Sequence, residues 1–163
     1  MEFLAARDLD EVLLSKAEQP DAQFLAGGTD LMVEINLAHH RPDSIISLRR
    51  VDELRTSTST RIGAGVTWEA LEAGEHRGLA QVARTVGSPQ IRAAGTIGGN
   101  VGTASPAGDG LPWIAAADGS VIVQSKERGE RSIPWRDFFV GVKRTSLEDD
   151  EVIVAVEVPE DTP

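Results

Sequence analysis

Glycine is the residue type whose placement in this sequence points most directly to ligand chemistry. The 163 residues include 16 glycines, which concentrate in two segments. The first segment is Ala26-Gly27-Gly28-Thr29-Asp30, and the second runs from Gly95 to Gly110 with six glycines. Because glycine lacks a Cβ atom, its backbone can turn tightly and approach a ligand closely. The two segments therefore predict a ligand held by main-chain amides.

The first glycine segment follows a short apolar run and precedes a helical pattern. Free N–H groups at the start of a helix favour an anion such as a phosphate. An ordinary strand-to-helix turn, capped by Thr29 or Asp30, is the alternative interpretation. Neither segment has the Lys of a nucleoside-triphosphate P-loop or the G-x-G-x-x-G fingerprint of a Rossmann fold. An arrangement of amides without Lys suits the diphosphate of a dinucleotide better than a triphosphate with magnesium.

The second glycine segment has no helical or strand periodicity, and we expect an irregular loop there. Its glycines alternate with apolar residues such as Ile97 and Val101 and with small polar residues. This composition suits a buried surface that offers amides and hydroxyls to a ligand. A tight irregular crossing of the core is the alternative.

No side-chain cluster in the sequence indicates acid–base, nucleophilic or metal chemistry. His39-His40 and His76 lack the spacing of metal ligands, and residues 148–151 (Glu-Asp-Asp-Glu) are expected to form a solvated turn. There is no Cys, which excludes disulfides, Cys-ligated zinc and an iron–sulfur cluster held by this chain. We therefore predict neither catalytic residues nor a metal site.

The composition also excludes some partners. With 16 Lys+Arg and 26 Asp+Glu, the formal net charge is −10, which argues against binding nucleic acid or an anionic membrane. No apolar run reaches the roughly 18 residues of a membrane span, and the N-terminus does not resemble a signal peptide. A cytoplasmic protein that does not insert into membranes is expected.

The elements that must position the glycine segments can be read from the apolar pattern, and their mixture indicates an α+β fold. In the first helix, Asp8 is the expected N-cap and the apolar stripe ends at Ala17. In the second helix, Leu31, Ile35 and Met32 are expected to face inward. The predicted helices are residues 8–18, 30–37, 67–71, 79–86 and 111–117, and the predicted strands are 24–26, 44–48, 61–66, 120–125 and 151–158.

Together, the two glycine segments resemble the paired FAD signatures of one family. Residues 26–30 and Thr96-Ile97-Gly98-Gly99-Asn100 are similar to those of the flavin subunit of molybdenum hydroxylases, as in aerobic carbon monoxide dehydrogenase and xanthine dehydrogenase. The resemblance continues through three further stretches in the same order: Pro89–Arg92, Trp113–Gly119, and Phe138–Gly141 leading to Glu151–Ile153. It covers nearly the whole chain.

The resemblance implies which residues would bind FAD. The residues expected at the diphosphate are Ala26, Gly27, Gly28, Thr29 and Asp30 on one wall, and Thr96, Gly98, Gly99 and Asn100 on the other. Leu25, which precedes the first wall, is also expected to bind FAD. Those expected at the ribityl chain or ring edge are Thr103, Ser105 and Asp109. Val86 would shield the flavin ring, where purine-oxidising relatives carry an aromatic residue. Val152 and Ile153 would lie beside the adenine.

The resemblance also implies a fold and a role. We expect a two-lobed α+β fold, with residues 1–55 as a small α/β lobe and 56–163 as a larger, mostly antiparallel lobe, lacking the usual C-terminal subdomain. FAD would take electrons from [2Fe–2S] clusters on a small partner subunit and pass them to an external acceptor. Molybdopterin would lie on a large partner subunit, and the chain would be inactive alone. A truncated scaffold that keeps the fold without retaining FAD is the alternative.

Overall fold

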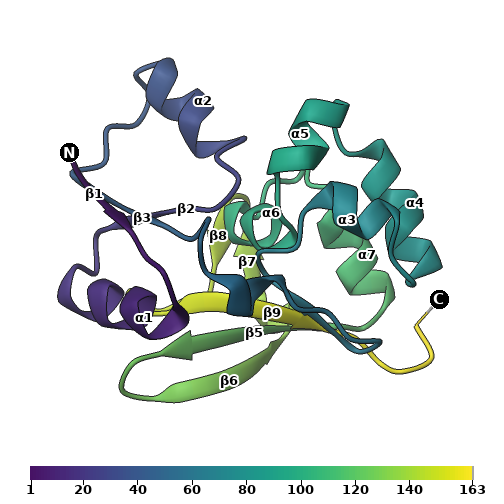
Figure 1. The fold of residues 1–163 in the computed structure, drawn as a ribbon. Helices are drawn as coiled ribbons and strands as arrows, with labels where there is room; N and C mark the ends of the chain where they lie inside the picture. The colour runs from purple at the N-terminus through teal and green to yellow at the C-terminus, as the bar shows by residue number, and fades with distance from the viewer. Residues whose placement is uncertain (163) are drawn as a thin grey trace.

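The N-terminal part of the chain forms a small parallel sheet in the computed structural model, which describes residues 1–162. Its strands follow the spatial order β1-β3-β2, so β3 is central and pairs in parallel with both neighbours. The elements of this lobe are β1 (Glu2–Ala5), α1 (Leu9–Glu18), β2 (Gln23–Leu25), α2 (Leu31–Asn36) and β3 (Ser44–Ser47). In Figure 1, α1 lies below this sheet and α2 stands above it.

The second lobe is built on an antiparallel sheet of order β4-β9-β5-β6. Its central strand β9 is buried along almost its whole length, because both of its faces are covered. A strand in that position needs a continuous apolar run, which Val152–Val156 provides. The strands of this sheet are β4 (Arg61–Gly63), β5 (Ser120–Ser125), β6 (Gly129–Pro134) and β9 (Val152–Glu157).

Short helices cover one face of the antiparallel sheet, and a two-stranded hairpin lies beside them (Figure 1). Three of these helices begin at a hydroxyl side chain that accepts a main-chain N–H: Thr67, Ser88 and Thr96. The remaining elements are η1 (Asp52–Arg55), α3 (Trp68–Glu72), α4 (Arg77–Thr85), α5 (Pro89–Ala94), α6 (Ile97–Thr103), α7 (Gly110–Ala116), α8 (Trp135–Phe138), β7 (Phe139–Gly141) and β8 (Arg144–Thr145).

Two apolar clusters hold the fold together, one on each face of the antiparallel sheet. The larger cluster joins the helices to the sheet, with Trp68, Ile114 and Phe138 almost fully buried. The smaller cluster joins the first lobe to the opposite face, where Ile46 and Leu54 belong to the same cluster as Val154. The two lobes thus share a core, and the boundary at residue 55 stays a prediction.

Three expectations about the helices were wrong, in whole or in part. The second glycine segment is irregular only in part: residues 97–103 form α6, because Thr96 caps the helix and Ile97 and Val101 are buried at helical spacing, whereas residues 104–109 form turns. No residue of α2 is fully buried: of the residues expected to face inward, Leu31 and Ile35 are half-buried and Met32 is exposed. In α1 the buried position near the C-terminal end is Lys16 rather than Ala17. Burial lowers the pKa of Lys16, whose ammonium donates to the carbonyls of Pro20 and Ala22.

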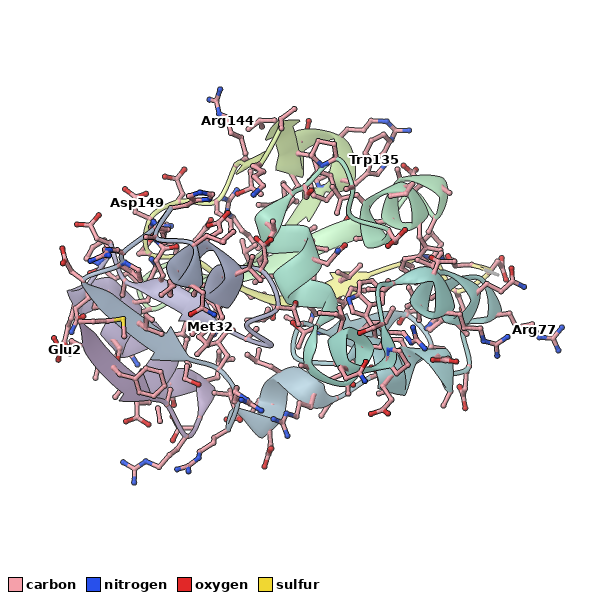
Figure 2. All side chains as sticks on the ribbon, turned by 90° about the horizontal axis from the view of Figure 1, so that it is seen from above. Glu2, Met32, Arg77, Trp135, Arg144 and Asp149 are labelled. Carbon is pink, nitrogen blue, oxygen red and sulfur yellow. The ribbon has the colours of Figure 1, made fainter. Side chains whose placement is uncertain are left out.

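No helix within residues 1–162 is long and apolar enough to cross a membrane. Charged side chains project outward around the rim of the molecule, for example Glu2 at one end, Arg77 at the other and Arg144 on the hairpin of β7 and β8 (Figure 2).

Candidate functional site

A cavity of about 790 Å³ lies between the two lobes. Its walls come from β2, α2 and the loop between them on one side, and from α5, α6 and the start of β9 on the other. These two groups of elements face each other in Figure 1. Both glycine segments line the cavity, so residues far apart in the sequence contribute to one site.

The first glycine segment is locked against the second by its backbone. Gly28 has a positive φ of 76°, a conformation that other residue types adopt only with strain. A Cβ atom on Gly27 would collide with the carbonyl of Ala94, so only glycine allows this close approach. Asp30 begins α2 without capping it, and its carboxylate instead accepts a hydrogen bond from the Thr103 hydroxyl at 3.4 Å. The segment is thus a strand-to-helix turn whose N-cap residue, Asp30, makes no side-chain capping hydrogen bond.

Within α6, neighbouring glycines have different surroundings. A Cβ atom on Gly98 would lie 2.5 Å from the Cβ of Ala64, so Gly98 allows the helix to pack on the turn that follows β4. A Cβ atom on Gly99 would meet only the Thr96 hydroxyl at 3.1 Å and the Ala26 Cβ at 3.9 Å. Gly98 therefore serves packing, whereas Gly99 leaves backbone exposed to the cavity.

The polar side chains of α6 are already partly engaged by the protein. The Thr96 hydroxyl oxygen accepts from the Gly99 amide at 3.0 Å, which leaves the hydroxyl proton available. The Asn100 Oδ1 accepts from the Gly110 amide at 3.2 Å, which leaves the Nδ2 group as the donor. Both side chains are therefore oriented by the fold before any ligand is considered.

The predicted binding residues come together at this cavity, with one exception. Leu25 does not line it, because it is the last residue of β2 and its carbonyl accepts from the Leu48 amide. Val86 lines the cavity from the end of α4, where it is largely buried. The residues that line it are Ala26, Gly27, Gly28, Thr29, Asp30, Val86, Thr96, Gly98, Gly99, Asn100, Thr103, Ser105, Asp109, Val152 and Ile153.

Charged residues that the sequence interpretation missed also line the cavity. These cations are Arg49, Arg55 and Lys143, which reaches in from the turn between β7 and β8. The Lys143 ammonium pairs with the Glu34 carboxylate at 3.0 Å. This hydrogen bond lowers the pKa of Glu34 and raises that of Lys143. No motif marks these cations, since each is a single residue brought in by the fold.

Glu151 is a buried carboxylate at the edge of the cavity, and the expectation of a solvated turn is wrong for it. Its two oxygens accept from Arg131 at 2.7 and 2.8 Å, and one also accepts from the Glu148 amide. Burial by itself raises the pKa of Glu151, but the hydrogen bonds from Arg131 and Glu148 outweigh it, and the pKa is lowered. Glu151 thus fixes the start of β9, where Val152 and Ile153 enter the wall.

Titratable side chains do not form a metal centre in the described part of the chain. Within residues 1–162, no group of three or more His, Asp or Glu side chains is arranged to hold a metal ion.

Residues 1–161 match the protein family described as the FAD binding domain in molybdopterin dehydrogenase. The chain belongs to this family. Among curated relatives, this FAD-binding domain is 39% identical to the nicotinate dehydrogenase FAD-subunit of Eubacterium barkeri, over 95% of the chain and 57% of the relative. It is 32% identical to the carbon monoxide dehydrogenase medium chain of Hydrogenophaga pseudoflava, over 85% of the chain and 51% of the relative.

Solved structures confirm the α+β fold of this FAD-binding domain. Carbon monoxide dehydrogenase from Hydrogenophaga pseudoflava matches with a TM-score of 0.90 and 30% identity, over 98% of this chain and 58% of that one. Quinoline 2-oxidoreductase from Pseudomonas putida 86 matches with a TM-score of 0.91 and 29% identity, over 100% of this chain and 59% of that one. The domain therefore spans a little over half the length of these chains.

Proposed function

We propose that this chain holds FAD in the cavity between its lobes, with the diphosphate where the two glycine segments meet. The observation that carries the proposal is the packing of Gly27 on the backbone of Ala94 and Gly95, which joins the two segments into one wall. Membership of an FAD-binding family supports the same ligand. So do relatives named as FAD subunits.

The residues present fit a dinucleotide. A cavity of about 790 Å³ falls within the range of small-molecule sites. Gly99 leaves main chain open on the cavity side, where a Cβ atom would otherwise stand. The Thr96 hydroxyl and the Asn100 Nδ2 group are the donors that remain free beside it. Neutral donors each contribute only about 1 kcal/mol, so binding would rest on several acting together.

The proposed roles follow the position of each residue on the cavity wall. The main chain of residues 26–30 and the donors of α6 would hold the diphosphate oxygens. Val86 would cover one face of the flavin ring, and the main chain at Val152 and Ile153 would lie beside the adenine. The residues proposed to meet the ribityl chain or the ring edge are Thr103, Ser105 and Asp109.

The proposed role in the whole enzyme is electron transfer. Bound FAD would supply the redox chemistry, taking electrons from [2Fe–2S] clusters on a small partner subunit and passing them to an external acceptor. Because residues 1–163 contain no Cys, such clusters would be held outside this segment, and we place them on the small subunit. A large partner subunit would carry molybdopterin and the substrate site, so the chain alone would not turn over substrate. We place this complex in the cytoplasm.

Flavin retention tests the proposal directly. The purified chain is incubated with FAD, passed through a desalting column and examined by visible absorption, and we expect bound flavin to co-elute with it. The variant Gly99→Val, whose side chain would enter the cavity, should elute without flavin while its far-UV circular dichroism is unchanged. Gly141→Ala is the matched control, because its Cβ would meet only the flexible Arg144 side chain at 3.7 Å. A folded wild-type chain that elutes without flavin would contradict the proposal and favour a scaffold that does not hold FAD.

A further inference from the structure

Lys143 is a cation at the cavity wall that neither glycine segment supplies. Its side chain enters from the turn between β7 and β8, and it lines the same cavity as Gly28 and Gly99. The two glycine segments contain no Lys or Arg of their own, and the helices that follow them are only six and seven residues long. Besides Lys143, the cations that line the cavity are Arg49 and Arg55, so a diphosphate there has few positive charges to neutralise it.

The backbone holds Lys143 in position. Its φ is positive, at 52°, and its amide donates to the carbonyl of Ala104 at 3.0 Å. Ala104 ends α6 with a left-handed conformation of its own, so the turn is tied to the C-terminal end of that helix. The position of the Lys143 Cα is thus set by α6, while its long side chain remains free to select a partner.

The partner that Lys143 has in this structure is exposed and easily displaced. Its ammonium lies 3.0 Å from Glu34, and the side chains of the two residues are 51% and 37% exposed. Exposed ion pairs are weak because water competes with them. Glu34 lies on α2, in which no residue is buried, so the carboxylate can move away without disturbing the core. Asp30, at the start of α2, adds a second negative charge near Lys143.

We propose that Lys143 is a binding residue for the diphosphate and that Glu34 competes with the ligand for its ammonium. This inference rests on the proposed function, since it names the charged contact of the same site. A diphosphate offers several oxygens with more negative charge than one carboxylate, and a charge-assisted hydrogen bond is about twice as strong as a neutral one. The ammonium therefore exchanges Glu34 for phosphate oxygens when FAD binds.

If this exchange takes place, substituting Lys143 and substituting Glu34 should change the affinity for FAD in opposite directions. Lys143→Met removes the contact, so FAD should bind about tenfold more weakly. Glu34→Gln removes the competitor, so FAD should bind about threefold more tightly. If the pair only braced the two lobes, both substitutions would break it and would change affinity in the same direction.

The experiment measures dissociation constants by titrating the chain with ligand and following flavin fluorescence. FAD is the principal probe, and riboflavin, which has no phosphate, is the second. The effect of each variant should appear with FAD and be absent with riboflavin. Lys126→Met and Glu69→Gln are the matched controls, because they make the same charge changes away from the cavity, and they should leave both constants unchanged.

The outcomes separate this inference from the proposed function. A wild-type chain that does not bind FAD overturns the proposed function itself. A wild-type chain that binds FAD, with Glu34→Gln and Lys143→Met both weaker or both unchanged, overturns only the exchange at Lys143. Equal effects on FAD and riboflavin would also overturn it, because the contact would then not be with the phosphates.

Discussion

The two adjacent glycines of α6, Gly98 and Gly99, have different roles: one allows close packing and the other leaves main chain exposed to the cavity. Gly98 faces the protein, where a Cβ atom would lie 2.5 Å from the Ala64 Cβ and 2.7 Å from its carbonyl oxygen. Gly99 faces the cavity and has no main-chain neighbour in its way. A motif that reads as two equivalent glycines in the sequence is therefore not symmetric in the fold.

Gly98→Ala is expected to lower the free energy of unfolding by about 2 kcal/mol. The added methyl group collides with main-chain atoms that cannot move aside, and overpacking of this kind outweighs the gain in helix propensity. Urea unfolding followed by circular dichroism measures the change, with Gly141→Ala as the control that should stay within about 0.5 kcal/mol of the wild type. An unchanged midpoint for Gly98→Ala would show that α6 does not pack against Ala64.

Gly99→Ala is expected to leave the unliganded fold intact while weakening FAD binding about tenfold. Alanine is a better helix former than glycine, so stability should stay equal or rise by up to about 1 kcal/mol. The loss of affinity follows because the methyl group covers main chain that faces the cavity. Urea unfolding of the variant checks the predicted stability, and flavin titration checks the predicted loss of affinity. Unchanged affinity in this variant would remove Gly99 from the proposed diphosphate site.

At the scale of single elements, the sequence predicted the apolar strands but not β1 and β6, whose residues are mostly exposed, nor the short helices α5, α6 and α8. The strands β5 and β9 could be predicted because their sequences are rich in Val and Ile, which favour strands. The helix α6 was not predicted, because three of its seven residues are glycines, which conceal a helical pattern. Its signals were nevertheless present: a capping Thr96 and apolar residues at Ile97 and Val101, four apart.

The sequence predicted the part of the site that is formed by the main chain of the glycine segments. It did not predict which charged side chains line the cavity. A segment rich in glycine is easily recognised in a sequence, because clustered glycines indicate a backbone that turns tightly or approaches another group closely. Lys143 and Glu34 are 109 residues apart and belong to no motif, so only the fold brings them together. Lys16 was missed for a similar reason: its burial depends on the carbonyls of Pro20 and Ala22, which accept hydrogen bonds from its ammonium.

The start of β9 is expected to make the fold sensitive to acid through Glu151. Because the pKa of this carboxyl is lowered below its ordinary 4.5, its ionised form stabilises the folded state. The contribution is complete above about pH 5 and is lost as the pH falls below 4.5 towards the folded value. Glu151→Gln should therefore lower the free energy of unfolding at pH 7 by about 2 kcal/mol and flatten its decline in acid.

Unfolding in urea between pH 7 and pH 3 measures this effect, with Glu69→Gln as the control for loss of an exposed carboxylate. Parallel pH profiles for the wild type and Glu151→Gln would mean that the ion pair with Arg131 does not contribute. Flavin titration of the same variant at pH 7 reports whether Val152 and Ile153 remain in place.

At the scale of the whole molecule, the two lobes are joined by a common core as well as by a common cavity. Side chains of the first lobe, among them Val12 and Ile46, share one apolar cluster with Ile122 and Val154 from the antiparallel sheet. The opposite face of that sheet carries the helices. The two lobes are therefore joined by this buried core in addition to the packing of Gly27 on Ala94 and Gly95 and the exposed ion pair between Lys143 and Glu34.

Val154→Ala is expected to destabilise both lobes together, by about 2 kcal/mol, because it removes buried methyl groups from the cluster that they share. The chain should unfold in a single transition. Hydrogen exchange resolved by peptide should accelerate in β3 and in β5 by similar factors, since both lose protection when the common core opens. Acceleration confined to β5 would mean that the first lobe folds independently. FAD would then bind at the joint of two separate units, and its affinity would depend on a docking equilibrium rather than on a preformed site.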